Sequence, residues 1–376
     1  MTSSQLRVTF GATQPKEEDI RAVLEVLRSG QLRLGRVCQE LERLVSTAVG
    51  CPHTVAMSSC TAALHSCLSM IDVRGREVIL PSLTFSATAA AIVHAGGIPR
   101  FAEVSPESLT LDCKHAERLI TRKTAAMIPV HIFGIPCDMT TLGAMAKGHS
   151  IFLVEDCAYG LGSRWDGVSV GTVGTAGCFS FGVLKNVTTG EGGAVTVKEQ
   201  DLAQRLREFR NYGMRVSRTG MKTHVCPGLN CKLTDIQAAL GVSQLRRLEN
   251  ILEKKRRIFS WYNARLETVR AVSTPKLDIR ALWNHTFYVL RLQVKQPSAR
   301  EVHLRMLQQG VETQVFSPLH LEPWVRERSR VSRGSLPVTE QLTKSLIALP
   351  SHLDMTERVV DLVVMALRKA LNSRAG

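Results

Sequence analysis

One lysine near the middle of the chain has surroundings that could make it a nucleophile. Lys185 lies in a polar turn bracketed by glycines, and apolar runs flank the turn at residues 177–181 and 194–197. Apolar flanks of this kind would place the lysine at the mouth of a buried core. Burial disfavours the ammonium form, and a neutral amine is a nucleophile. A hairpin that carries one solvated lysine is the alternative that this stretch alone leaves open.

An aspartate stands where a buried strand is expected to end. Residues 151–155 form a largely apolar run, which predicts a strand, and Asp156 comes directly after it. Ligands of open α/β sheets bind at the carboxyl ends of the strands. Asp156 therefore either caps the turn that follows or faces a ligand, and the pattern alone leaves both roles open.

Small hydroxyl residues precede an expected helix earlier in the chain. Ser58, Ser59 and Thr61 lie at the start of a segment that predicts a helix up to about residue 70. The first backbone N–H groups of a helix are unpaired and carry partial positive charge, so with a hydroxyl they form a cradle suited to phosphate. An ordinary N-cap is the alternative here.

The elements that must position these residues alternate between strands and helices. Strands are predicted at residues 77–80, 100–104, 125–131 and 151–155, and helices at 85–95, 140–146 and 201–209. Two further helices, at 20–27 and 38–48, precede them. Apolar strands that alternate with helices indicate an α/β fold with a mostly parallel sheet between helices.

A second, smaller unit is expected after the lysine region. Helical spacing runs from residue 234 to about 266, and we interpret it as one long helix that bridges two units. A strand at 286–294 and a last helix at 357–371 belong to the smaller α/β unit. We therefore predict a large domain over residues 1–245 and a small C-terminal domain over residues 246–376.

The composition favours a globular protein that binds small anions. Charged residues make up 22% of the chain and the formal net charge is +15, which indicates an anionic partner. Aromatic residues make up only 5%, and they do not interleave with the basic residues as they do in nucleic-acid binders. We therefore expect anionic small molecules, and no nucleic acid, as partners.

The cysteines and the hydropathy pattern bear on the cellular setting. None of the ten cysteines has the spacing of a zinc site, so we expect small core residues in a reducing compartment and no metal. No apolar run reaches the length of a bilayer span, and residues 1–10 lack the build of a signal peptide. The sequence therefore predicts a cytoplasmic protein without membrane contact.

The candidate groups form the set that pyridoxal 5′-phosphate (PLP) needs: a lysine that traps its aldehyde, a carboxylate for its ring nitrogen and a phosphate cradle. The sequence resembles the DegT/DnrJ/EryC1/StrS aminotransferases, the sugar aminotransferases among the fold type I PLP enzymes. The resemblance covers nearly the whole chain, and motifs in a common order carry it. They lie at residues 81–88, 129–134, 154–162, 179–193, 228–241, 317–320 and 349–350, and include Thr-Gly-Glu-Gly-Gly at 189–193.

The resemblance implies a role in cofactor binding for five residues. Lys185 would form the Schiff base with PLP, and Asp156 would pair with the protonated ring nitrogen. The phosphate would be held by Thr61, the backbone N–H of Ala62 and Ser180. Lys185 would also move the proton during transamination. A lysine at this position, where some relatives have histidine and act as dehydratases, favours transamination.

Four further positions follow from the resemblance. Phe85 would pack on the cofactor ring, and Tyr159 stands beside that ring where the family usually has His or Gln. Asn230 would reach the phosphate of the cofactor in a second subunit, which implies a homodimer with shared active sites. His320 lies in a substrate-facing stretch of the family. Phe85 as a core residue and Asn230 as a turn residue are the structural alternatives.

The resemblance also implies a reaction. An amino acid, glutamate in most relatives, would give its amino group to a keto sugar carried on a nucleoside diphosphate, in amino-sugar or antibiotic biosynthesis. A keto-cyclitol or another ketone without a nucleotide is the alternative acceptor. A PLP-binding regulatory protein without turnover is the alternative of another class.

Overall fold

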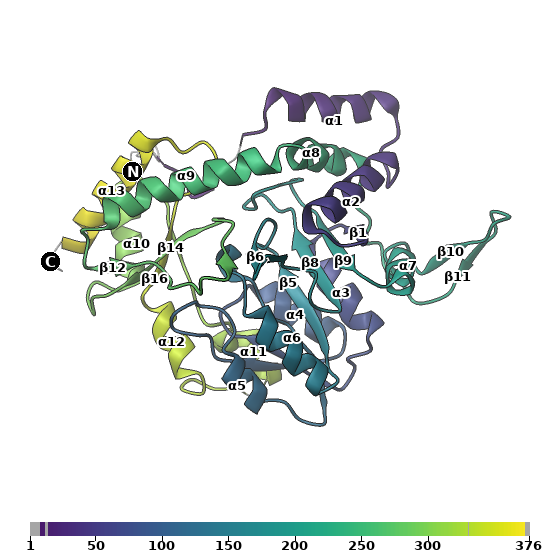
Figure 1. Cartoon of the computed structure of the whole chain (residues 1–376), viewed down its shortest axis with the longest axis horizontal. Helices are drawn as coiled ribbons and strands as arrows, with labels where there is room; N and C mark the ends of the chain where they lie inside the picture. The colour runs from purple at the N-terminus through teal and green to yellow at the C-terminus, as the bar shows by residue number, and fades with distance from the viewer. Residues whose placement is uncertain (1–7, 12–13, 330, 373–376) are drawn as a thin grey trace.

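The computed structural model describes residues 8–11, 14–329 and 331–372, and a seven-stranded sheet lies at its centre (Figure 1). The strand order is β1-β9-β8-β5-β4-β2-β3. Neighbours from β8 to β3 pair in parallel, whereas β9 pairs antiparallel with β8 and β1, so the predicted mostly parallel sheet is confirmed. The strands are β1 (His53–Met57), β2 (Glu77–Pro81), β3 (Ile98–Ala102), β4 (Thr124–Met127), β5 (Phe152–Cys157), β8 (Ala176–Ser180) and β9 (Gly193–Val197).

Helices cover both faces of this sheet. Successive residues of a strand point to opposite faces, so each strand contributes to two cores. In β5, Val154 belongs to a core with side chains from α3 (Cys60–Met70), α4 (Ser86–His94) and α7 (Gln200–Phe209). Leu153 belongs to the opposite core, with α5 (Cys113–Arg118) and α6 (Met139–Gly148). Asp156 shares the face of Val154, and it therefore points toward α3 and α4.

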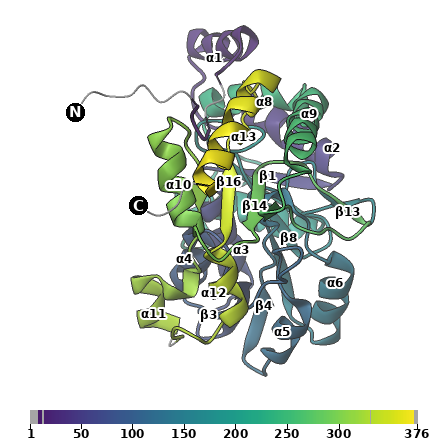
Figure 2. The ribbon, with the colours of Figure 1, turned by 90° about the vertical axis from the view of Figure 1, so that its left-hand side faces the viewer.

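A four-stranded antiparallel sheet, in the order β12-β14-β16-β15, forms the second unit. It shares one core with four helices, and Figure 2 shows two of them, α10 and α13, close to β16. This is the smaller C-terminal α/β unit that the sequence predicts, while the boundary at residue 245 stays a prediction. Its elements are α9 (Leu248–Leu266), β12 (Val272–Ser273), β14 (Tyr288–Leu292), α10 (Ala299–Gln308), β15 (Gln314–Val315), β16 (Leu346–Leu349) and α13 (Glu357–Asn372).

The bridging segment differs from its prediction. The single helix predicted for residues 234–266 is wrong, because the segment forms two helices, α8 (Asp235–Leu245) and α9, with a turn at Arg246 and Arg247 between them. The Arg247 guanidinium donates to the Asp19 carboxylate at 2.7 and 2.8 Å. Asp19 lies in α1 (Glu17–Ser29), so a contact with the start of the chain holds the turn.

Strand ends also differ from their predictions. β5 extends to Cys157, so Asp156 lies within the strand, and β14 is shorter than the predicted strand 286–294.

A hairpin that the sequence does not predict, β10 (Met214–Val216) and β11 (Lys222–His224), projects from the body (Figure 1). Among the helices of the described residues, none is both long and apolar enough to cross a membrane. The other elements are α2 (Arg36–Val49), η1 (Ile132–Gly134), β6 (Arg164–Trp165), β7 (Val168–Ser169), β13 (Ala281–Leu282), η2 (Leu319–Leu321), α11 (Pro323–Ser329) and α12 (Pro337–Thr343).

Candidate active site

The candidate residues meet at one edge of the large sheet. Ser180 is the last residue of β8, and Asp156 lies opposite Cys178 on the neighbouring strand β5. Ser180 pairs with Gly193 of β9, which in turn pairs with Met57 at the end of β1. The chain then turns directly from β1 into α3. The strand pairing therefore brings Asp156, Ser180 and the start of α3 together.

A close approach of backbone shapes the proposed phosphate cradle. A Cβ on Gly193 would come within 2.6 Å of the backbone nitrogen of Cys60, so only glycine lets β9 lie against the first turn of α3. Ser59 caps this helix, because its hydroxyl accepts the backbone N–H of Ala62 at 3.1 Å. The cap is therefore Ser59, and the Thr61 hydroxyl is not needed for that purpose. The half-buried Thr61 and Ser180 leave two hydroxyls at this helix start, which fits a phosphate.

Asp156 is a buried carboxylate in a polar setting. It is 4% exposed, and it accepts the Thr88 hydroxyl at 2.8 Å and the Ala158 backbone N–H at 3.0 Å. Burial raises the pKa of Asp156 above its usual range, while these hydrogen bonds and the Lys185 ammonium act against that rise. A buried carboxylate is stabilised by a cationic hydrogen-bond donor, so the site fits a protonated ring nitrogen.

Phe85 begins the helix α4, which carries Thr88, a hydrogen-bond donor to Asp156. It is the N-cap residue of α4, and the backbone N–H of Thr88 donates to its carbonyl at 3.2 Å. The Phe85 side chain is 70% exposed, which contradicts the interpretation as a core residue. An exposed aromatic residue at the start of the helix that contacts Asp156 fits a role against the flat face of a cofactor ring. Together with the cradle and Asp156, it makes a site that fits PLP.

Lys185 lies in the loop that joins β8 to β9. The two strands form a hairpin, as the structural alternative requires, and the lysine is half-buried. Val187 after it is buried, whereas Val183 and Leu184 before it are exposed. The amine nitrogen of Lys185 lies 3.3 Å from the ring centroid of Tyr159. The Tyr159 ring in turn packs on Phe287, with 5.1 Å between centroids. Tyr159 thus supports the lysine amine through a cation–π contact, a role that the sequence did not predict.

Glu155, directly before Asp156 in β5, forms a buried pair with His131 that the sequence did not predict. The Glu155 carboxylate accepts backbone N–H groups of Gly171, Val173 and Gly174 at 2.7–2.8 Å and lies 3.1 Å from Nε2 of His131. Nδ1 of His131 accepts the backbone N–H of Cys137, which assigns the proton to Nε2. The pair and Cys157 are close enough to hold a metal ion, but hydrogen bonds occupy His131 and Glu155. In the sequence, the position of Glu155 directly before Asp156 is the feature that could have indicated this pair.

Asn230 lies at the base of the projecting hairpin and is exposed. Its neighbour Cys231 accepts the backbone N–H of Ser58 at 2.8 Å, so this segment touches the start of α3 in its own chain. In the described residues no hydrogen bond joins the Asn230 side chain to Thr61 or Ser180. The geometry is therefore open to a role toward either its own site or that of a second subunit.

His320 does not face a substrate-accessible surface. Its side chain is fully buried, Nδ1 lies 2.6 Å from the Ser82 hydroxyl, and Nε2 lies 3.2 Å from the Glu340 carboxylate. Burial lowers the pKa of His320, although Glu340 acts in the other direction. Both ring nitrogens have partners within the chain, so this geometry does not support the expected substrate contact.

The chain is similar to known proteins along nearly its whole length. Residues 13–368 match the sequence pattern of the DegT/DnrJ/EryC1/StrS aminotransferase family. The spore coat polysaccharide biosynthesis protein SpsC of Bacillus subtilis is 32% identical, over 94% of both chains. GDP-perosamine synthase of Caulobacter vibrioides is 32% identical, over 90% of this chain and 91% of its own. The PLP form of the putative sugar aminotransferase Spr1654 from Streptococcus pneumoniae superposes with a TM-score of 0.89 at 27% identity, over 96% of this chain and 99% of that one.

Proposed function

This chain belongs to the DegT/DnrJ/EryC1/StrS aminotransferase family and is a PLP-dependent aminotransferase, and from that premise we propose that it transfers an amino group from an amino acid to a keto sugar. The observation that carries the proposal is the meeting of Lys185, Asp156 and the start of α3 at one edge of the sheet. A nucleophilic amine, a buried carboxylate and a phosphate cradle are the groups that amino transfer on PLP requires.

The proposal gives each residue a task. PLP supplies an aldehyde that exchanges amines and a ring that accepts electrons. Asp156 holds the proton on the ring nitrogen, and Phe85 covers the ring face. Thr61, Ser180 and the backbone N–H of Ala62 hold the phosphate. The Lys185 amine then moves the proton between the substrate carbon and the cofactor, as a general base and acid.

The substrates are proposed from the family resemblance and from the relatives. Glutamate is the proposed amino donor. A sugar linked to a nucleoside diphosphate is the proposed acceptor, because the name of one relative specifies a GDP-linked amino sugar and the net charge of +15 suits a diphosphate. A keto-cyclitol or another ketone is the alternative acceptor, and amino-sugar or antibiotic biosynthesis is the proposed setting.

We also propose a homodimer. The hairpin and its base expose a row of large apolar side chains: Tyr212, Val216, Met221, Val225 and Leu229 are 44–64% exposed. Apolar residues gathered on a projecting arm are typical of a surface that a second subunit covers. The position of Asn230 at the base of this arm supports a site shared between subunits. These features support the proposed homodimer. A cytoplasmic location is proposed from the sequence.

Purified protein loaded with PLP tests this function. Adding glutamate alone should change the absorbance of the bound cofactor and release 2-oxoglutarate. A panel of keto sugars, free and nucleotide-linked, and keto-cyclitols should then restore the absorbance only with the true acceptor, and mass spectrometry should find the amino product. If the cofactor binds but no amino donor and acceptor react, the regulatory alternative replaces the proposal.

A further inference from the structure

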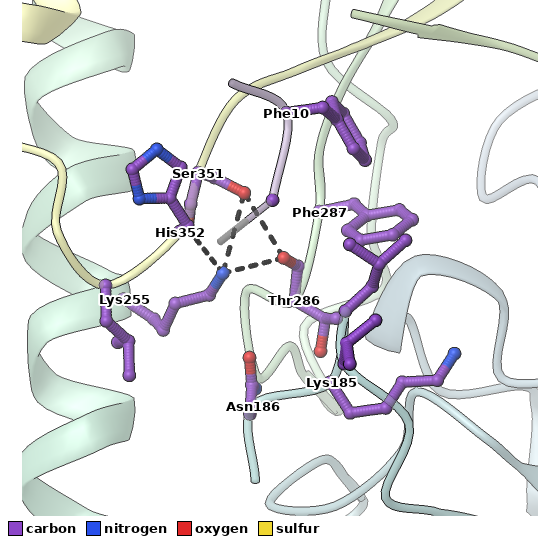
Figure 3. Close-up of a pocket in the computed structure, with 12 residues that line it drawn as sticks. Phe10, Lys185, Asn186, Lys255, Thr286, Phe287, Ser351 and His352 are labelled. Carbon is purple, nitrogen blue, oxygen red and sulfur yellow. Dashed lines mark hydrogen bonds between the residues drawn. The ribbon is translucent and has the colours of Figure 1, made fainter. Parts of the chain in front are cut away.

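A second lysine, Lys255 of α9, is buried close to the loop of Lys185. It is 5% exposed, and its ammonium nitrogen donates to the carbonyl oxygens of Thr286 at 2.7 Å and Ser351 at 2.6 Å (Figure 3). No carboxylate pairs with it among the described residues. Burial lowers the pKa of Lys255 to about 7. Burying an amine without a counter-ion opposes folding, so the contacts of Lys255 need an explanation.

The two acceptors of Lys255 lie at the ends of neighbouring strands. Thr286 precedes β14 and Ser351 follows β16, and these strands pair through Tyr288 and Leu349. The Ser351 hydroxyl also donates to the carbonyl of Thr286 at 3.2 Å. Lys255 therefore joins α9 to both strand ends and fixes the position of Thr286.

Thr286 in turn contacts the residue beneath the reactive lysine. The Thr286 hydroxyl lies 3.2 Å from the carbonyl oxygen of Tyr159 and 2.8 Å from the side-chain oxygen of Asn284. The Asn284 amide donates to the carbonyl oxygen of Tyr159 as well. The ring of Tyr159 lies under the Lys185 amine. The segment 284–286 therefore holds the aromatic support of Lys185.

The same segment holds the backbone next to Lys185. Asn186 is 7% exposed, and its side-chain amide donates to the carbonyl oxygen of Asn284 at 3.3 Å. In Figure 3 the Lys185 side chain points away from Lys255, so the two amines do not approach each other. The contacts that link Lys255 to the surroundings of Lys185 therefore run through the segment 284–286.

We propose that Lys255 is a positioning residue for the aminotransferase reaction: by holding segment 284–286, it keeps Tyr159 and Asn186 in the places that aim the Lys185 amine at the cofactor. This inference rests on the proposed function, since it assigns Lys185 the reaction with PLP. Misplacement of a reacting group by about 1 Å can cost on the order of a hundredfold in rate, so a remote clamp of this kind has a measurable effect.

The test follows the capture of PLP by the cofactor-free protein. PLP is added, the bond to the lysine is trapped by borohydride at timed intervals, and peptide mass spectrometry quantifies modified Lys185. No amino donor or acceptor is present, so failure to find a substrate for the enzyme would leave this readout intact. Far-ultraviolet circular dichroism and the melting temperature establish that each variant is folded.

Lys255→Met removes the donors and keeps the length of the side chain, and Lys254→Met is the matched control on an exposed neighbour. The proposal predicts capture at Lys185 at least about tenfold slower in Lys255→Met and unchanged in Lys254→Met. The rate constants of both half-reactions should also fall in the Lys255→Met enzyme, with little change in the KM for donor and acceptor. Capture at the wild-type rate in a folded Lys255→Met protein would overturn the proposal.

Thr286→Val keeps the proposal testable if Lys255→Met does not fold. Valine removes the hydroxyl that reaches Tyr159 and keeps the carbonyl that accepts from Lys255. Slower capture in folded Thr286→Val supports the proposal by itself. Where Lys255→Met also folds, no further slowing in the double variant supports one shared path. Capture at the wild-type rate in Thr286→Val would show that Lys255 does not act through this segment.

Discussion

At the scale of single residues, Asp156 is a buried charge whose partner determines its role. Even with hydrogen bonds from Thr88 and Ala158, burial still penalises the ionised carboxylate, as its raised pKa indicates. A protonated ring nitrogen would offset that penalty. The same interaction would keep the ring an electron acceptor during proton transfer.

Asp156→Asn is therefore expected to keep the fold and most of the bound cofactor but to lose about 10²–10³ in kcat, the scale of removing one key electrostatic partner. Steady-state kinetics and the cofactor absorbance measure the two effects separately. Thr88→Val, which removes the hydroxyl that bonds Asp156 and Thr84 but keeps the carboxylate, should cost less in kcat. Loss of folding without a specific loss of rate in Asp156→Asn would instead support a role as a turn cap.

The types and order of Lys185, Asp156, Thr61 and Ser180 predicted that they meet, because parallel strands end at one edge of a sheet. The contact between Lys185 and Tyr159 could not be predicted in this way. The Tyr159 ring also packs against Phe287, a residue of the second unit. Sequence spacing carries no information on that packing.

At the scale of elements, the break between α8 and α9 shows where periodicity fails. Helical spacing continues through Arg246 and Arg247, so the pattern predicts one helix. The turn is fixed by the ion pair of Arg247 with Asp19, two residues 228 positions apart. The burial of His320 has a similar origin, because Ser82 and Glu340 reach it from other parts of the chain.

The contribution of His320 to the stability of the fold is expected to decrease as the pH falls. The folded-state pKa of His320 is lowered by burial, so the unfolded chain binds the proton more readily. The stability that neutral His320 contributes is therefore present above its unfolded pKa of about 6.5 and is lost as the pH falls below it. Urea unfolding should show the gap between wild type and His320→Gln narrowing from pH 7.5 to pH 5.

The same variant separates a structural role from a substrate role. Loss of buried hydrogen bonds predicts that His320→Gln lowers the free energy of unfolding by about 1–3 kcal/mol at pH 7.5. The KM for donor and acceptor should hardly change. A raised acceptor KM with unchanged stability would restore His320 as a substrate residue.

At the scale of the whole molecule, the projecting hairpin raises the question of which site Asn230 serves. Asn230 is exposed at the base of the hairpin, whereas the adjacent Cys231 touches the start of α3 in the same chain. A shared site and a site within one chain make opposite predictions for a mixed dimer.

An Asn230→Ala chain and a Lys185→Ala chain, each inactive alone, can be co-expressed with different tags. If Asn230 serves the second subunit, a mixed dimer has one site with both defects and one intact site. A random mixture should then recover about a quarter of the wild-type activity. If Asn230 serves its own chain, every site keeps one defect and no activity returns. A fully active monomer in sedimentation would also reject the shared site.

The role of Lys185 in amino transfer is tested most directly by measuring the first half-reaction. Protein loaded with PLP is mixed with glutamate in the absence of any acceptor, and the released 2-oxoglutarate is counted against bound cofactor. We expect about one 2-oxoglutarate per cofactor for wild type and for Lys198→Ala, a change at an exposed lysine, and none for Lys185→Ala. Release of 2-oxoglutarate by Lys185→Ala at the wild-type rate would contradict the role of Lys185, and no release of a 2-oxo acid by wild type from any amino acid would contradict amino transfer.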